Sequence, residues 1–311
     1  ASVVSGFTSP SGEANAFKLV EDTSTAAHSV FRNSSTVTLS SHSFSCFVKT
    51  NGRNVKLDFF GGTNNAIFDL TNGTVISANG TGLTAKIELF SGNWYRCSVT
   101  QVQTSTTIYP NILTVDNFNN STYQGDGTSG VYIYGAQLEQ KSYATSYIPT
   151  SGASATRNQE LCNDATPVIN SEEGTLYAEI SALADEATTK SISINSGSST
   201  NVVRISFFSN VILARIVSPS GTTSNLTYTV PSINDFYKVA FKYNATLNNH
   251  ALYVNGALRF TSTQVIDLGS SLTTLSFADG NAAGNFYGNT KDLKYYPKAL
   301  ADVQLQDLTT L

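Results

Sequence analysis

The stretch VYIYGAQLEQKSYATSYIPTSGASATR, residues 131–157, constrains the fold more than any other part of the chain. Its first four residues alternate between aliphatic and tyrosine side chains, the period-2 pattern of a β-strand whose two faces are differently solvated. Pro149 and the small polar residues after it then end regular structure, because proline cannot donate a ladder hydrogen bond. The stretch therefore predicts the last strand of one domain, a linker and a second domain.

The length and composition fit this division. A chain of 311 residues is about two ordinary domains, and we place them at residues 1–148 and 159–311 with the linker at 149–158. Only 13% of the residues are charged, and Ser, Thr, Asn, Gly and β-branched residues abound, which suits pleated sheets and tight turns better than helices. Short apolar or alternating segments recur between Gly, Asn and Pro breaks. We expect an all-β protein of two tandem antiparallel β-sandwiches of the jelly-roll type.

Two local signals are more specific. Asn255-Gly256 between two alternating segments is the strongest hairpin signal in the chain. The only convincing helix is a short one at the C-terminus, where Leu300, Val303, Leu308 and Leu311 fall on one helical stripe. We expect this helix to pack on the second sandwich.

Charge and hydropathy exclude two kinds of partner. The net charge is −4 and no block of Lys and Arg is present, so we expect no nucleic-acid partner. No apolar run approaches the roughly 20 residues of a membrane helix, so we expect no membrane insertion.

The three cysteines Cys46, Cys97 and Cys162 form no CxxC pair, so neither a zinc site nor a disulfide framework is predicted. Cys46 and Cys97 lie in strand-like segments among apolar neighbours, and we interpret them as buried thiols. A cross-link between them is the alternative if their strands are adjacent.

Several segments carry a resemblance to a known family. The first half contains AFKLVEDT, GNWYR, VYIYGAQLE and TSYIPT, and the second contains GTLYAEI, ARIVS, FYKVAFKYN, HALYVNGAL and FYGNTKDLKYYPKALADVQLQDL. The first set resembles a module of bacteriophage virion proteins. The second resembles a laminin-G-like, concanavalin A-like jelly roll found in phage tail fibres and appendages.

This resemblance implies a protein of the virion surface, made in the host cytoplasm, that binds host cell-surface polysaccharide during attachment. Other virion proteins and further copies of the chain, as a trimer, are the implied partners. The alternative is a purely structural capsid-decoration or tail protein that binds no sugar.

We expect no enzyme activity. A glycosidase dyad on one strand needs two carboxylates two residues apart, and none of the 22 acidic residues has another at that spacing. A dyad split between strands stays open. His28, His42 and His250 lie in polar or turn-like segments outside any lyase-like pattern, and we interpret them as solvated turn residues.

The candidate sugar-binding residues in the first domain are mainly aromatic. Tyr132 and Tyr134 share one face of a strand, the spacing that two stacking platforms need, and Tyr123 and Asp126 lie in the loop before them. The alternative is that the tyrosines fill the inside of the sandwich.

The candidate glycan-binding residues in the second domain are basic. Arg204 and Arg215 alternate with apolar neighbours along two strands, so both leave the core. Arginine binds carboxylates through two parallel hydrogen bonds, which predicts an anionic glycan.

A calcium ion is the one cofactor considered. Asp126 in QGDG, together with Asp279 and Asn281 in DGN, offers oxygen donors beside glycines. Turn formation is the alternative reason for both sequences.

Overall fold

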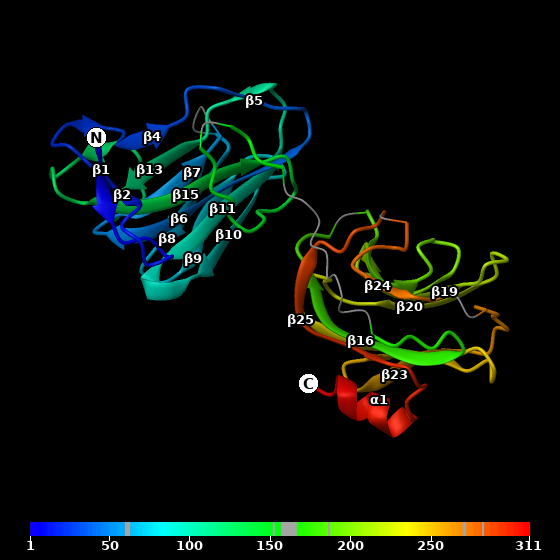
Figure 1. The fold of residues 1–311 in the computed structure, drawn as a ribbon. Helices are drawn as coiled ribbons and strands as arrows, with labels where there is room; N and C mark the ends of the chain where they lie inside the picture. Colours follow the sequence, from blue (N-terminus) through cyan, green and yellow to red (C-terminus); the bar gives the residue numbers. More distant parts are fainter. Residues whose placement is uncertain (60–62, 152, 157–166, 186, 270–271, 282) are drawn as a thin grey trace. The chain divides into compact units, whose positions relative to one another are not determined.

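The computed structural model describes residues 1–59, 63–151, 153–156, 167–185, 187–269, 272–281 and 283–311. The chain separates into two compact units, Ala1–Ala155 (unit 1) and Thr156–Leu311 (unit 2), as Figure 1 shows. The division falls inside the predicted linker, whereas the expected start of the second domain at residue 159 lies outside the described residues. The expected fold class is confirmed, because each unit is built from antiparallel sheets and one short helix follows at the C-terminus.

Unit 1 is a sandwich of two main sheets. Its larger sheet has the spatial order β1 (Ser2–Phe7), β2 (Ala16–Val20), β15 (Gly130–Glu139), β6 (Ser41–Asn51), β11 (Tyr95–Val102) and β10 (Thr84–Leu89). The facing sheet has the order β4 (Ser29–Phe31), β13 (Asn111–Val115), β7 (Asn54–Asp58), β8 (Asn65–Asp69) and β9 (Thr74–Asn79). The smaller elements are the pairs β12 (Thr107–Ile108) with β5 (Ser35–Thr36) and β14 (Tyr123–Gln124) with β3 (Thr25–Ala26), and a 3-10 turn, η1 (Ser91–Asn93).

The interior of unit 1 follows the period-2 pattern of the strands. Val131 and Ile133 on β15 point into the core beside Cys46 and Cys97, which lie directly opposite each other on β6 and β11. Both cysteines are free and fully buried, so the buried-thiol interpretation is confirmed for them. Cys162 lies outside the described residues.

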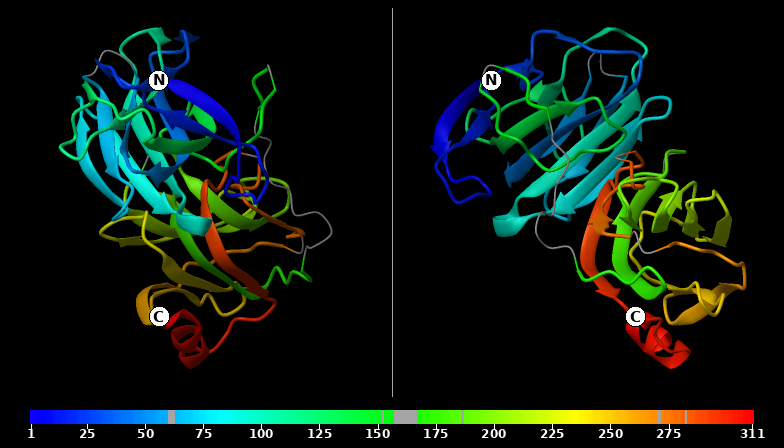
Figure 2. Two further views of the ribbon diagram at one scale, coloured as in Figure 1. Left: turned by 90° about the vertical axis from the view of Figure 1, so that its left-hand side faces the viewer. Right: turned by 45° about the vertical axis from the view of Figure 1, so that its right-hand side comes forward.

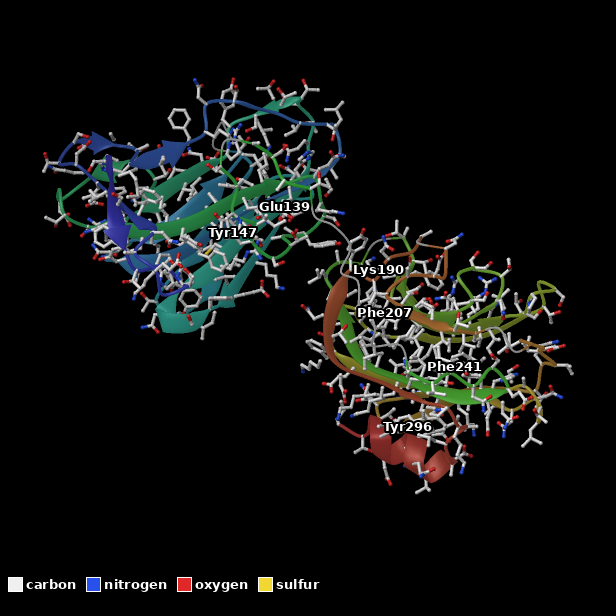
Figure 3. The ribbon with its side chains drawn as sticks, viewed as in Figure 1. Glu139, Tyr147, Lys190, Phe207, Phe241 and Tyr296 are labelled. Carbon is white, nitrogen blue, oxygen red and sulfur yellow. The ribbon has the colours of Figure 1, made fainter. Side chains whose placement is uncertain are left out.

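Unit 2 is a sandwich of two five-stranded sheets. One has the order β23 (Ala257–Ser262), β22 (His250–Val254), β21 (Tyr237–Asn244), β16 (Glu173–Ala182) and β25 (Gly288–Tyr296). The other, called here the β18 sheet, has the order β20 (Thr223–Thr229), β19 (Val211–Val217), β18 (Val202–Phe208), β17 (Lys190–Asn195) and β24 (Thr274–Ser276). Phe207 and Phe241 come from opposite sheets and both belong to the core between them (Figure 3).

The hairpin signal at Asn255-Gly256 is confirmed. The two residues join β22 to β23 and have positive φ values of 48° and 74°. A two-residue turn with both central φ values positive matches the right-handed twist of the strands, which explains why Asn-Gly is favoured there.

The predicted helix exists, but its buried stripe differs from the one expected. Helix α1 (Asp302–Thr309) lies against the outer face of β21, β22 and β23 (Figures 1 and 2). Leu305 and Thr309 are its fully buried residues, and Leu305 packs with Tyr177, Ala251 and Tyr253, whereas Val303 is 63% exposed. Leu300 and Leu308 of the expected stripe do pack against this cluster, whereas Val303 and Leu311 are exposed. The stripe was wrong in part because the helix spans only Asp302–Thr309, which leaves Leu311 beyond its end. No helix among the described residues has the length and apolar character needed to cross a membrane.

The histidine interpretation was also wrong, because all three side chains are buried. His250 shows why: its Nδ1 accepts a hydrogen bond from the backbone N–H of Asn244, and its Nε2 lies 3.0 Å from the carbonyl oxygen of Gln264. Partners from two turns satisfy both ring nitrogens, so the imidazole needs no water.

Candidate functional site

A row of polar side chains crosses the outer face of the β18 sheet. Along β17, β18 and β19 the isoleucines point into the core, so their neighbours point outward. The strand register places one outward residue from each strand side by side. In order across the sheet, these residues are Ser276, Ser193, Arg204, Arg215 and Asn225.

The turn between β18 and β19 brings the two arginines together. Ser209 and Asn210 form a two-residue connection, and both have positive φ, 45° and 58°. Residues equidistant from such a turn lie opposite each other, and Arg204 and Arg215 are paired in this way. Their Cβ atoms are therefore in the range of about 4.5–5.5 Å that directly opposed residues adopt.

Two like charges in this position repel each other, and little in the protein compensates them. The Arg204 side chain is only 12% exposed, and burial together with the nearby Arg215 lowers its pKa from the usual arginine value. The Nε atoms of both arginines are buried and donate no hydrogen bond to any described residue. The pair therefore places two positive charges side by side on this face, with unpaired Nε–H donors beneath it.

One carboxylate approaches the pair. Asp279 lies in the loop between β24 and β25, and its Oδ2 is 3.8 Å from Nη1 of Arg204. Its Oδ1 accepts hydrogen bonds from the backbone N–H groups of Asn281 and Ala283, each at 3.2 Å. In the described part of the chain, Arg215 has no comparable acidic partner. Two guanidinium groups and one carboxylate leave one net positive charge at the site.

These groups suit binding of an oxyanion. A guanidinium offers a planar fork of N–H donors that matches a carboxylate or phosphate, and the exposed amide of Asn225 beside Arg215 is a group that binds sugar hydroxyls. Sequence reasoning found both arginines but missed Asn225. Its signal was present as the same period-2 alternation, but its position beside Arg215 depends on the register between β19 and β20.

Two of the candidate aromatic residues of unit 1, Tyr132 and Tyr134, lie on the outer face of its larger sheet. Tyr132 and Tyr134 point away from the core, so the alternative that they fill the inside of the sandwich is wrong. Other rings cover them, however: the centroids of Phe7 and Tyr132 are 5.0 Å apart, and those of Tyr147 and Tyr134 are 5.4 Å apart. Both tyrosines are half-buried and do not stand free as stacking platforms.

Tyr123 does not fit the expected role of a sugar platform. It is 8% exposed, and its hydroxyl donates to Oε2 of the buried Glu21 at 2.6 Å. Arg53 binds both oxygens of the same carboxylate, at 2.6 and 2.8 Å. Burial and Glu21 raise the pKa of Tyr123 to about 12. The expectation failed because Glu21, 102 residues away in the chain, draws the ring into the interior.

The residues considered for calcium form turns instead. Asp126 Oδ1 accepts hydrogen bonds from the backbone N–H groups of Thr128 and Ser129, each at 2.7 Å, and its Oδ2 lies 3.3 Å from Nη2 of Arg53. Asp279 is used in the same way, and Asn281 donates to Ser199. The described residues contain no group of three His, Cys, Asp or Glu side chains that could hold a metal ion. These carboxylates face donors and cations, a donor set that does not fit calcium.

The pairing of β16 with β25 brings two carboxylates together that the sequence left apart. Glu179 and Asp292 are directly opposite each other on the outer face of their sheet. Lys291 lies 3.4 Å from Glu179, and Lys294 pairs with Asp292. The two acids therefore belong to a cluster of ion pairs in which each negative charge has a cation beside it.

Comparison with known proteins gives likeness of fold only. No family model and no curated protein matches the chain. The CBM40 of Ruminococcus gnavus IT-sialidase, solved bound to α2,3-sialyllactose, is 17% identical, and the match covers 45% of this chain and 83% of that one with a TM-score of 0.39. The SAP-like pentraxin of Limulus polyphemus is 14% identical over 43% of this chain and 68% of that one, with a TM-score of 0.35. The binding domain of botulinum neurotoxin serotype G is 12% identical over 45% and 37%, with a TM-score of 0.35.

Proposed function

We propose that this chain is a glycan-binding protein of a bacteriophage virion surface, and that it attaches the particle to an anionic polysaccharide of the host cell. The observation that carries the proposal is the cross-strand pair of Arg204 and Arg215 on the outer face of the β18 sheet. Two half-buried guanidinium groups directly opposite each other repel, and an anion bound between them would relieve this repulsion.

The phage assignment rests on the resemblance of the segments in both halves to virion modules. A weak sugar site gains strength by repetition, since a second site on the same particle binds at a high effective concentration. The proposal therefore includes assembly of the chain as a trimer together with other virion proteins. Mass measurement of the full-length protein across a range of concentrations tests this part, and a monomer at every concentration would contradict it.

A purely structural role in the capsid or tail is the second candidate. The observation that favours it is the packing in unit 1, where Phe7 and Tyr147 pack against Tyr132 and Tyr134. In that case the jelly rolls serve as building blocks and the arginine pair meets a neighbouring protein.

Binding to polygalacturonate, a polymer of uronic acid, and to dextran, a neutral polymer, separates these candidates. We expect the protein to bind polygalacturonate at low salt, and the double variant Arg204→Gln/Arg215→Gln to lose at least about tenfold in affinity, the order expected for charge-assisted hydrogen bonds. The matched control is Lys291→Gln/Lys298→Gln, which removes two exposed positive charges from the other side of unit 2.

If both double variants bound polygalacturonate equally weakly, the loss would come from the change in net charge and not from the arginine pair. Absence of binding to both polymers, to a glycan array and to host cells would favour the structural role. Melting curves of each variant show that the comparison is made on folded protein.

A further inference from the structure

Asp279 lies beside the arginine pair and influences which anions the site can bind. This inference rests on the proposed function. Asp279 Oδ2 lies 3.8 Å from Nη1 of Arg204 and already compensates one of the two positive charges. We propose that Asp279 is a specificity-determining residue, which limits the site to singly charged oxyanions and disfavours doubly charged ones.

The charge count gives the physical reason. Two guanidinium groups and one carboxylate leave a single net positive charge, so one negative charge on the ligand brings the site to neutrality. A second negative charge on the ligand would find no further cation, because Asp279 already compensates the charge of Arg204 and the first ligand charge compensates that of Arg215. The carboxylate of Asp279 would also repel it. Uronate carboxylates and phosphodiesters carry one charge, whereas phosphate monoesters carry nearly two at neutral pH.

The local structure fixes Asp279 independently of any ligand. Its backbone N–H donates to the carbonyl oxygen of Ala283 at 2.9 Å, and its Oδ1 accepts from the N–H groups of Asn281 and Ala283. The same loop is anchored to β17, where the Ser193 hydroxyl donates to the carbonyl oxygen of Ala278 at 2.6 Å. The carboxylate therefore stays beside Arg204 rather than swinging away when an anion enters.

The variant Asp279→Asn tests this role while keeping the loop. Asparagine retains one side-chain oxygen that accepts the two turn hydrogen bonds and loses only the negative charge. Asp307→Asn is the matched control, since Asp307 is exposed on α1, which packs on the opposite sheet of unit 2. The probes are glucuronate as the carboxylate, diethyl phosphate as the phosphodiester and glucose 6-phosphate as the dianion.

We expect the unmodified protein to bind glucuronate, diethyl phosphate or both more tightly than glucose 6-phosphate in titrations followed by calorimetry or NMR. Asp279→Asn should strengthen binding of a singly charged probe by about threefold to tenfold, and binding of the dianion by about the square of that factor, because Coulomb energy scales with ligand charge. The relative affinities of glucuronate and diethyl phosphate separate a uronate polymer from a phosphodiester polymer as the source of the charge.

Unchanged affinities, or an equal loss for all probes, in a folded Asp279→Asn protein would overturn the inference while leaving the glycan-binding proposal intact. If the unmodified protein binds none of the probes and none of the polymers, the proposed function fails, and the inference fails with it. If Asp307→Asn changed the affinities as much as Asp279→Asn does, the effect would come from the overall charge of the protein and not from the contact between Asp279 and Arg204.

Discussion

The ring of Tyr147 packs directly on Gly135. Gly135 has a φ of +62°, and a Cβ added there would lie 3.2 Å from two ring carbons of Tyr147. Glu139 holds the same returning segment by accepting hydrogen bonds from the N–H and hydroxyl of Thr145, and Glu139 and Tyr147 are labelled in Figure 3. Gly135 and Glu139 thus have a structural role, because they fasten the returning segment onto the outer face of the larger sheet.

Substitution of Gly135 by alanine should therefore destabilise unit 1. The left-handed φ alone costs about 1–2 kcal/mol for a residue with a Cβ, and the contact with Tyr147 adds to it. Gly82→Ala is the control, because Gly82 has a φ of +68° and open space around it. We expect a larger loss of unfolding free energy in urea for Gly135→Ala than for Gly82→Ala. Equal losses of unfolding free energy would show that the ring of Tyr147 can move aside without destabilising unit 1.

The stability of unit 2 should fall as the pH is lowered through about 6.5. Burial lowers the pKa of His250 below its ordinary value of 6.5, and its Nδ1 accepts a hydrogen bond that protonation would remove. Below pH 6.5 the unfolded state therefore binds a proton at His250 more readily than the folded state does, so the stabilisation present at neutral pH is lost on acidification. His250→Gln keeps both hydrogen bonds without titrating, and its unfolding free energy should lack this component. The same pH slope in both proteins would contradict the assignment.

Cys46 and Cys97 should resist thiol reagents in the folded protein. Burial raises the pKa of Cys46 to about 12 and also raises that of Cys97, so the reactive thiolate is scarce at pH 8. In a Cys162→Ser background we expect both thiols to react with Ellman's reagent at least about a hundredfold more slowly in buffer than in urea. Rapid reaction of two thiols in buffer would be inconsistent with this burial.

Excess chelator should leave the melting temperature unchanged. The side-chain oxygens of Asp126 and Asp279 already accept backbone hydrogen bonds and face Arg53 and Arg204. A bound calcium ion would instead stabilise the folded state by mass action, and its removal would lower the midpoint. A drop of several degrees on chelation, reversed by added calcium, would restore the metal hypothesis.

Limited proteolysis with a protease of broad specificity should cut first within residues 149–158. This segment lacks large apolar side chains that would anchor it to a core, and cleavage concentrates in such connections. Two fragments, of about 150 residues each, should then accumulate. First cuts inside residues 1–148 or 159–311 would place the boundary elsewhere.

The sequence by itself determined the class of fold and the direction of most side chains. Alternation along each strand is a local property, so it correctly assigned Val131 and Ile133 to one face and Tyr132 and Tyr134 to the other, while the structure showed which face is the core. A turn that needs positive φ at two positions was equally visible in Asn255-Gly256. Both follow from backbone geometry and need no knowledge of distant residues.

Only the tertiary structure decided which outward residues meet. Arg204 faces Arg215 because Ser209 and Asn210 form a two-residue turn, although that pair is a weaker turn signal than Asn-Gly, and a change of one residue in the loop would have shifted the register. Asp279 reaches Arg204 from the loop between β24 and β25, and Glu21 contacts Tyr123 across 102 positions. Contacts of this kind depend on strand order and packing between sheets, since a local pattern fixes the face of a side chain but not its neighbour.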